Sequence, residues 1–137
     1  MTQVLVLDAQ GGGMGRAVVE QLKKAMPDQP VTAVGTNAAA TAAMLKAGAD
    51  QAATGENAVR VNAAKADLII APIGMVLCDS MLGEVTAGMA LAVGSAPGHR
   101  ILIPAARCGV QVAGLPEISL TEAVSAAVSA AVVWLRR

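Results

Sequence analysis

One stretch near the N-terminus determines the class of fold: Val4-Leu5-Val6-Leu7-Asp8-Ala9-Gln10-Gly11-Gly12-Gly13-Met14-Gly15. Its apolar, partly β-branched beginning predicts a strand over residues 3–8. A glycine-rich turn follows, and residues 14–26 then show the apolar spacing of an amphipathic helix, which Pro27 ends. A strand, a glycine loop and a helix in this order are typical of the first unit of a nucleotide-binding α/β domain.

The alternation of apolar runs and helical patterns continues along the chain and predicts a parallel sheet. We expect strands at residues 3–8, 30–35, 50–53, 67–71, 100–104 and 110–113. We expect helices at residues 14–26, 37–47 and 86–93, and a short helix or turn at 55–57. Residues 75–82 fit an extended chain as well as a helix that starts at Asp79 or Ser80.

A last helix is predicted to open with the capping box Ser119-Leu120-Thr121-Glu122. Its expected buried stripe consists of Leu120, Val124, Ala127, Val128, Ala131 and Leu135. Together these patterns predict an α/β fold. We expect one Rossmann-like domain over residues 1–137, with three α/β/α layers and a mostly parallel sheet of five or six strands.

The composition excludes several classes of protein. Of 137 residues, 55% are apolar and 15% are charged, which excludes an intrinsically disordered chain. The chain has one Trp, no Tyr and no Phe, so it lacks the aromatic rings on which single-stranded nucleic acids stack. Ten basic and ten acidic residues balance to a net charge of zero, so we expect no nucleic-acid partner.

No membrane role is expected either, because the apolar run at residues 123–135 is shorter than the ~20 residues that span a bilayer. The N-terminus lacks the basic region of a signal peptide. We therefore expect a cytoplasmic protein in which Cys78 and Cys108 are reduced thiols; whether the two lie close together stays open. The alanine-rich core buries little area per side chain, and we expect an apolar face to be buried in a homo-oligomer.

The candidate ligand site lies at the carboxyl ends of the predicted strands, where parallel α/β sheets bind ligands. These ends correspond to residues 10–15, 35–37, 54–57, 72–74 and 105–108. Backbone N–H groups at the start of a helix bind anions, and glycine lets a ligand approach the backbone closely. The candidate binding residues are Gln10, Gly11, Gly12, Gly13, Met14, Gly15, Thr36, Asn37, Glu56, Asn57 and Gly74.

Structural interpretations of the same residues stay open. The glycines also fit a tight turn that only packs a helix against a strand, and Asn37 also fits the N-cap of the next helix. Glu56 fits a turn with a cap as well as a ribose ligand or an acid–base group. Arg16 would add positive charge to a phosphate site, and Glu84 is a weak candidate for a general base. With one His in the chain, no metal site is predicted.

The sequence does not identify the cofactor, although a nucleotide or dinucleotide fits the loop. In the pattern G-x-G-x-x-G, Gln10 replaces the first glycine. A dinucleotide site also has an acidic residue at the end of the second strand, which binds the ribose, and here Thr36 and Asn37 stand at that point. The small anionic ligand therefore stays undefined, and no catalytic residue is identified.

Three functions agree with these observations. The leading hypothesis is a protein that binds a nucleotide or phosphometabolite through the glycine-rich loop after the first strand. The first alternative is a metabolite sensor, or a structural homo-oligomer, without turnover. The second is a small nucleotide-cofactor-dependent enzyme whose site is shared between subunits.

Several segments of the chain resemble one family: the run from Asp8 to Gly15, then Gly35-Thr36-Asn37, Met44-Leu45-Lys46-Ala47-Gly48-Ala49-Asp50, Ala53-Thr54-Gly55-Glu56-Asn57-Ala58, Pro72-Ile73-Gly74 and Ser80-Met81-Leu82-Gly83-Glu84. The chain is similar along nearly its whole length to an uncharacterised family of short, single-domain bacterial proteins, known as a domain of unknown function. This resemblance implies a Rossmann-like protein and assigns no activity. The glycine turn also resembles that of nicotinamide-cofactor dehydrogenases.

Overall fold

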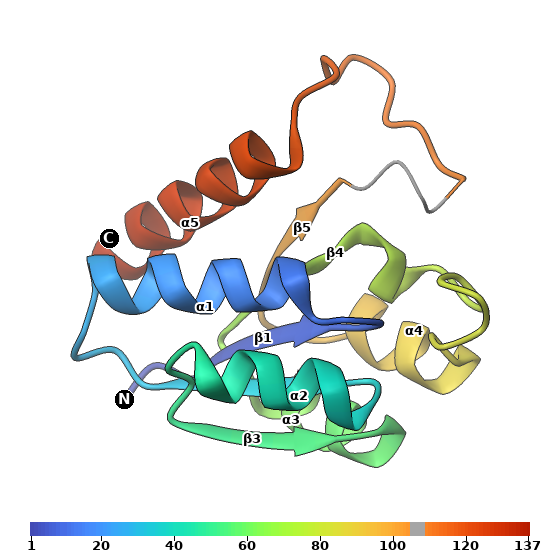
Figure 1. The fold of residues 1–137 in the computed structure, drawn as a ribbon, viewed down its shortest axis with the longest axis horizontal. Helices are drawn as coiled ribbons and strands as arrows, with labels where there is room; N and C mark the ends of the chain where they lie inside the picture. The colour runs from blue at the N-terminus through green and yellow to red at the C-terminus, as the bar shows by residue number, and fades with distance from the viewer. Residues whose placement is uncertain (105–108) are drawn as a thin grey trace.

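The computed structural model describes residues 1–104 and 109–137. It contains a five-stranded sheet in which all strands are parallel, in the order β3-β2-β1-β4-β5 (Figure 1). The strands are β1 (Val4–Asp8), β2 (Val31–Gly35), β3 (Gln51–Thr54), β4 (Leu68–Pro72) and β5 (His99–Ile103). The predicted parallel sheet is confirmed with five strands, and each lies within one or two residues of its expected position.

The order of the strands creates a crevice at one end of the sheet. The chain adds β2 and β3 on one side of β1 and then crosses to place β4 on the other side. The pairing of β1 with β4 ends at Val6 opposite Ile70, whereas β1 and β2 stay paired to Asp8 opposite Gly35. The sheet therefore opens between the carboxyl ends of β1 and β4, which is where doubly wound sheets bind ligands.

Helices cover both faces of the sheet and give the predicted three layers (Figure 1). One face packs against α1 (Gly13–Ala25), α2 (Ala38–Lys46) and α5 (Leu120–Arg136). The other face packs against α3 (Glu56–Lys65) and α4 (Ala87–Gly94). Side chains alternate between the two cores along a strand, as Val6 and Leu7 of β1 show. The central strands β1 and β4 are buried at every residue, as expected for a covered parallel sheet.

The last helix mostly follows its predicted pattern. Ser119 caps α5: its hydroxyl accepts from the backbone N–H of Glu122 at 3.2 Å. The same hydroxyl donates to Oε1 of Glu122 at 3.1 Å. The middle of the expected stripe is buried against α1 and β5. Leu120 is 55% exposed, contrary to the prediction, because the first turn of α5 precedes the part that packs on the domain. Among the described residues, no helix has the length and apolar character to cross a bilayer.

The predicted sixth strand at residues 110–113 is wrong. This segment is irregular and exposed, and Val110 and Val112 are 43% and 42% accessible. The glycines on either side, Gly109 and Gly114, have φ of 66° and 82°, so the chain turns at both ends of the segment. The alternating pattern of apolar side chains therefore has no neighbouring strand against which to pack.

One further expectation is confirmed and another is corrected. The short helix or turn predicted to open at residues 55–57 is α3, a helix of ten residues. Residues 75–82 hold neither a strand nor a helix that begins at Asp79 or Ser80: a 3-10 turn, η1 (Ile73–Val76), is followed by a series of turns. The expected strand end at residues 105–108, with Cys108 and its distance from Cys78, lies outside the described residues.

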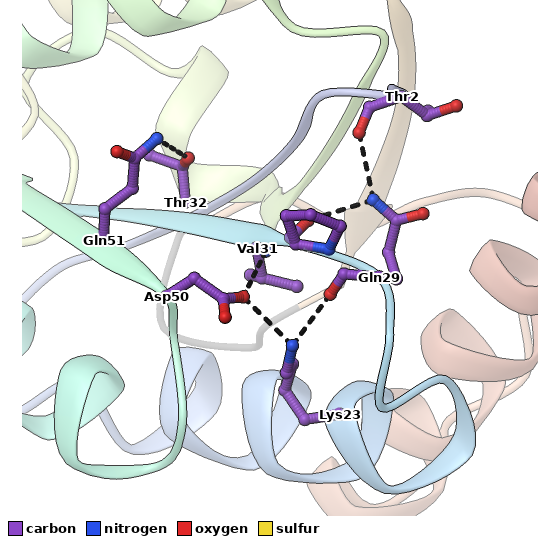
Figure 2. Close-up of polar contacts among 8 residues, drawn as sticks. Thr2, Lys23, Gln29, Val31, Thr32, Asp50 and Gln51 are labelled. Atoms are coloured by element: carbon purple, nitrogen blue, oxygen red, sulfur yellow. Dashed lines mark hydrogen bonds and ion pairs between the residues drawn. The ribbon is translucent and has the colours of Figure 1, made fainter.

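At the amino end of the sheet, opposite the glycine loop, a polar cluster joins α1 to the starts of β2 and β3 (Figure 2). A carboxylate oxygen of Asp50 accepts from the backbone N–H of Val31 at 2.8 Å and from Nζ of Lys23 at 3.0 Å. Lys23 also donates to the carbonyl oxygen of Gln29 at 2.9 Å. The hydrogen bonds from Val31 and Lys23 hold the pKa of Asp50 below its ordinary value.

We predict that Asp50→Asn lowers the free energy of unfolding by about 1 kcal/mol at neutral pH, because the ion pair and the charge on the acceptor are lost. A lowered pKa stabilises the fold above the pKa of the unfolded chain, and this contribution disappears as the pH falls through the folded value. Urea titrations of both proteins should therefore converge in strong acid. Asp28→Asn, at an exposed turn, is the control and should leave stability unchanged; a gap that persists at low pH would contradict the explanation.

Candidate functional site

The loop between β1 and α1 is held by a buried carboxylate. Asp8, the last residue of β1, is 4% exposed. One of its oxygens accepts from the N–H of Ala9 at 2.8 Å, and the other accepts from the N–H of Gly15 at 2.6 Å. Burial raises the pKa of Asp8, against the effect of these two hydrogen bonds. The carboxylate thereby ties the beginning of the loop to the first turn of α1.

The glycines of this loop fall into two groups. A Cβ at Gly12 would lie 2.8 Å from Cα of Ala40, and its φ of 75° is left-handed. A Cβ at Gly15 would lie 2.6 Å from the sulfur of Met44 and 2.8 Å from Cβ of Asp8. These two glycines are therefore required by the turn and by the close packing of α1 on α2 and β1.

Gly11 and Gly13 have no such requirement. A Cβ at either position would meet no atom within 4 Å, and neither has a left-handed backbone. Both residues are exposed beside the N-terminus of α1. The packing of the chain thus explains two glycines of the loop, and the other two leave open space above the backbone.

The loop also has backbone donors without a recorded acceptor. The N–H of Gly12 bonds to the carbonyl of Ala9 at 3.0 Å, and that of Gly15 bonds to Asp8. Among the residues that the structure describes, the N–H groups of Gly11, Gly13 and Met14 have no acceptor. Because these groups begin a helix of thirteen residues, the helix dipole adds a partial positive charge at the same point.

The carboxylate of Glu84, from a distant part of the chain, joins the glycine loop to Thr36 and Asn37 after β2. We call these four residues, Gln10, Thr36, Asn37 and Glu84, the rim of the site. One oxygen of Glu84, Oε1, accepts from the N–H of Gln10 at 2.9 Å, from the hydroxyl of Thr36 at 2.7 Å and from the amide of Asn37 at 2.7 Å. Partial burial raises the pKa of Glu84, but these three hydrogen bonds outweigh that effect and bring the pKa below its ordinary value. Glu84 is therefore ionised at neutral pH.

Asn37 caps α2, which is the structural role weighed from the sequence, and it also bonds to the glycine loop and to Glu84. Its side-chain oxygen, Oδ1, accepts from the N–H of Ala40 at 2.9 Å and caps α2. Its side-chain nitrogen, Nδ2, donates to the backbone carbonyl of Gln10 at 2.9 Å and to Glu84. Thr36 is bound to the same edge, because its N–H donates to the carbonyl of Asp8 at 3.0 Å. The structure thus brings the predicted residues at the ends of β1 and β2 together.

The remaining candidates have other contacts. Glu56 accepts from the hydroxyl of Thr86, and its carboxylate fills the space beside Gly88, so it joins α3 to α4. Asn57 accepts from Arg60 one turn further along the same helix. Gly74 lies buried in η1, and its carbonyl accepts from the hydroxyl of Ser80 at 2.6 Å; none of these contacts reaches the glycine loop.

The segment that carries Glu84 has an unusual backbone. Asp79, Met81 and Leu82 have φ of 65°, 55° and 58°, in the left-handed region that costs ordinary residues roughly 1–2 kcal/mol each. Gln10, which contacts Glu84, has φ of 52°. Such conformations cluster at functional sites, where the surrounding contacts hold them in place.

The basic side chain next to the loop is paired with a carboxylate, and no metal ligands gather in the described part of the chain. Arg16, which was weighed as a phosphate ligand, lies 3.5 Å from Glu20 on the exposed face of α1. No three His, Cys, Asp or Glu side chains gather as metal ligands within residues 1–104 and 109–137. A cavity of about 530 Å³ lies between Ile73 and residues 109–118, and its lining includes no residue of the glycine loop.

The fold and the loop define a Rossmann-like α/β protein whose glycine loop lies at the switch point of the sheet. The chain belongs to the family described as Domain of unknown function (DUF3842), whose model matches residues 3–135, and this confirms the resemblance noted from its motifs. Among solved structures, a dodecameric FMN-dependent UbiX-like decarboxylase from Escherichia coli O157:H7 is similar, with a TM-score of 0.47 and 16% identity over 98% of this chain and 96% of that chain. No curated protein matches the chain.

The two groups of glycines predict opposite effects of a methyl group. We expect Gly15→Ala to lower the free energy of unfolding by about 1–3 kcal/mol, because its Cβ would overlap Met44 and Asp8. Gly13→Ala should leave stability unchanged or slightly higher, because the space is open and alanine favours the helix. Urea denaturation of both variants tests this; equal losses of stability would show that Gly13 is also a packing glycine.

The strained segment before Glu84 predicts a stabilising substitution. Leu82 is 99% exposed, so Leu82→Gly removes no packing and relieves the left-handed strain, and we expect a gain of about 1 kcal/mol in the free energy of unfolding. Leu91→Gly is the matched control: this leucine is 71% exposed within α4, and its replacement should cost about 1 kcal/mol. Chemical denaturation compares the two, and a loss at both positions would argue against strain at Leu82.

Proposed function

We propose that this protein binds the phosphate group of a nucleotide or phosphometabolite on the glycine loop between β1 and α1. The observation that carries the proposal is the coincidence of open space and free donors. A Cβ at Gly11 or Gly13 would meet open space, and the N–H groups of Gly11, Gly13 and Met14 have no acceptor among the described residues. An anion on these donors would meet the positive end of α1.

The charges around the loop favour a ligand bound through backbone donors. The two ion pairs recorded among the described residues join Arg16 to Glu20 and Lys23 to Asp50, so both of these cations already face carboxylates. A bound phosphate would therefore take its hydrogen bonds from N–H groups and the helix dipole. Such a site accommodates a singly substituted phosphate better than a dense polyphosphate, which requires cations.

Binding without turnover fits the site better than catalysis. The ionisable side chains that contact the loop are Asp8 and Glu84, and both accept hydrogen bonds from groups that position them. Within the described structure, the hydroxyl that contacts either carboxyl is that of Thr36, which donates to Glu84 at 2.7 Å and so helps to hold it in place. A site completed by a second subunit remains the alternative for an enzyme, and turnover of a bound nucleotide would distinguish the two.

The homo-oligomer and the cytoplasmic location stay predictions. The apolar stripe of α5 is largely buried within its own chain. Apolar side chains remain exposed elsewhere, including Leu91 at 71% and Val133 at 72%. An oligomer would therefore use these positions, and light scattering of the purified protein measures its mass directly.

Thermal melts with AMP, FMN, NAD and ribose 5-phosphate test the proposal. A ligand at about 100 times its dissociation constant adds about 2.7 kcal/mol, which corresponds to a rise of roughly 10 °C in Tm. Gly13→Val should abolish this rise, because the branched side chain fills the open space above the donors. Gly94→Val is the control, since Gly94 is also exposed and open but lies at the end of α4.

Each result has a clear meaning. A rise in Tm that Gly94→Val keeps and Gly13→Val loses supports the loop as the site. A rise that both variants keep would place the ligand elsewhere. The absence of a rise with every phosphorylated ligand would overturn the proposal.

A further inference from the structure

We propose that Glu84 recognises the vicinal hydroxyl groups of a ribose, so that the ligand of this protein is a ribose phosphate or nucleotide with free 2′- and 3′-hydroxyls. The inference rests on the proposed phosphate site and adds the class of ligand. It depends on where Glu84 lies, on which of its oxygens is used, and on the charge that it brings to the rim.

The position of Glu84 is that of a ribose ligand. In sheets of this topology, an acidic residue at the end of β2 binds the ribose of a dinucleotide whose phosphates lie on the glycine loop. Here β2 ends at Gly35, and Thr36 and Asn37 follow it. Glu84 reaches across from the segment between η1 and α4 and bonds to both side chains. The carboxylate that is missing from the sequence after β2 is therefore present in space.

One of the two carboxylate oxygens of Glu84 is bound by the protein, and the other is open. Oε1 is saturated by three donors from Gln10, Thr36 and Asn37. In the described structure, no donor binds the other oxygen, Oε2, and the residue is only partly buried. A positioned, ionised carboxylate with one open oxygen accepts hydroxyl groups and repels anions.

The two ends of the proposed ligand fit along one loop. The N–H of Gln10 binds Glu84, and the N–H of Gly11, which has no acceptor among the described residues, belongs to the next residue of the loop. The donors of Gly13 and Met14 continue toward α1. A ligand would thus meet hydroxyl acceptors at the β2 side and phosphate donors at the α1 side, which is the polarity of a phosphorylated ribose.

The charge of the rim selects against a phosphate on the sugar. Glu84 is ionised, because its three hydrogen bonds hold its pKa below the ordinary value. Among the described residues, Glu84 forms no ion pair with an Arg or Lys. Its carboxylate would repel a 2′-phosphate, so NADP should bind much more weakly than NAD.

Calorimetric titration of four probes tests the inference: AMP, 2′-deoxy-AMP, NAD and NADP. We expect the wild-type protein to bind AMP at least tenfold more tightly than 2′-deoxy-AMP, the effect of one hydrogen bond to a charged acceptor. Glu84→Gln should bring the two affinities within about threefold and should also reduce the preference for NAD over NADP. Glu20→Gln, on the exposed face of α1, is the matched control and should keep the wild-type ratios.

The ratio of affinities separates recognition from a structural role. If Glu84 only holds its segment against the loop, Glu84→Gln weakens AMP and 2′-deoxy-AMP equally and the ratio stays at its wild-type value, which would overturn the inference. Glu84→Asp keeps the charge on a shorter side chain. A preference of this variant for AMP over 2′-deoxy-AMP that is smaller than that of the wild type supports recognition even if Glu84→Gln is poorly folded. Equal binding of AMP and 2′-deoxy-AMP by the wild type rejects this inference and leaves the phosphate site standing, whereas no binding of any probe rejects both.

Discussion

The buried carboxylate of Asp8 is the contact on which the site depends. By accepting from Ala9 and from Gly15, it holds the glycine loop closed on itself and brings the first turn of α1 against the end of β1. This approach is close enough that Gly15 has no room for a side chain. Since the loop satisfies Gly12 and Gly15 internally, the N–H groups of the exposed positions are the ones left for a ligand.

The topology of the sheet places the rest of the site around this loop. β1 and β4 stop pairing before β1 ends, and the chain that follows β4 is free to turn back toward β2. It does so through left-handed residues and ends with Glu84 on Thr36 and Asn37. The carboxylate thus crosses the switch point and joins two loops that belong to different βα units. A rigid scaffold that holds a left-handed segment in place through the polar contacts of Glu84 is the arrangement expected of a binding site, because packing alone gives no reason for the backbone strain.

Most of the fold could be predicted from the sequence, because strand-forming runs and glycine punctuation are local signals. The residues after β1 and β2 were also predicted to meet, since parallel strands bring their carboxyl ends to one edge. Glu84 was not predicted to join them: it lies 74 residues from Gln10 and 47 from Asn37, and no local pattern encodes a contact of that range. The sixth strand failed for the opposite reason, because residues 110–113 have the right alternation but no neighbour that buries Val110 and Val112.

The near absence of aromatic residues gives the polar rim its importance. The one tryptophan, Trp134, stacks on His99 at 5.5 Å between ring centroids, and His99 begins β5 at the amino end of the sheet, away from the glycine loop. A nucleotide on the loop would therefore find no aromatic face for its base among the residues that form the site. Its binding energy has to come from the phosphate and the sugar, whose partners are backbone N–H groups and a fixed carboxylate. Recognition of this kind discriminates strongly between hydroxyl and phosphate substituents of the sugar and weakly between bases, because every partner in place is polar and none contacts a ring.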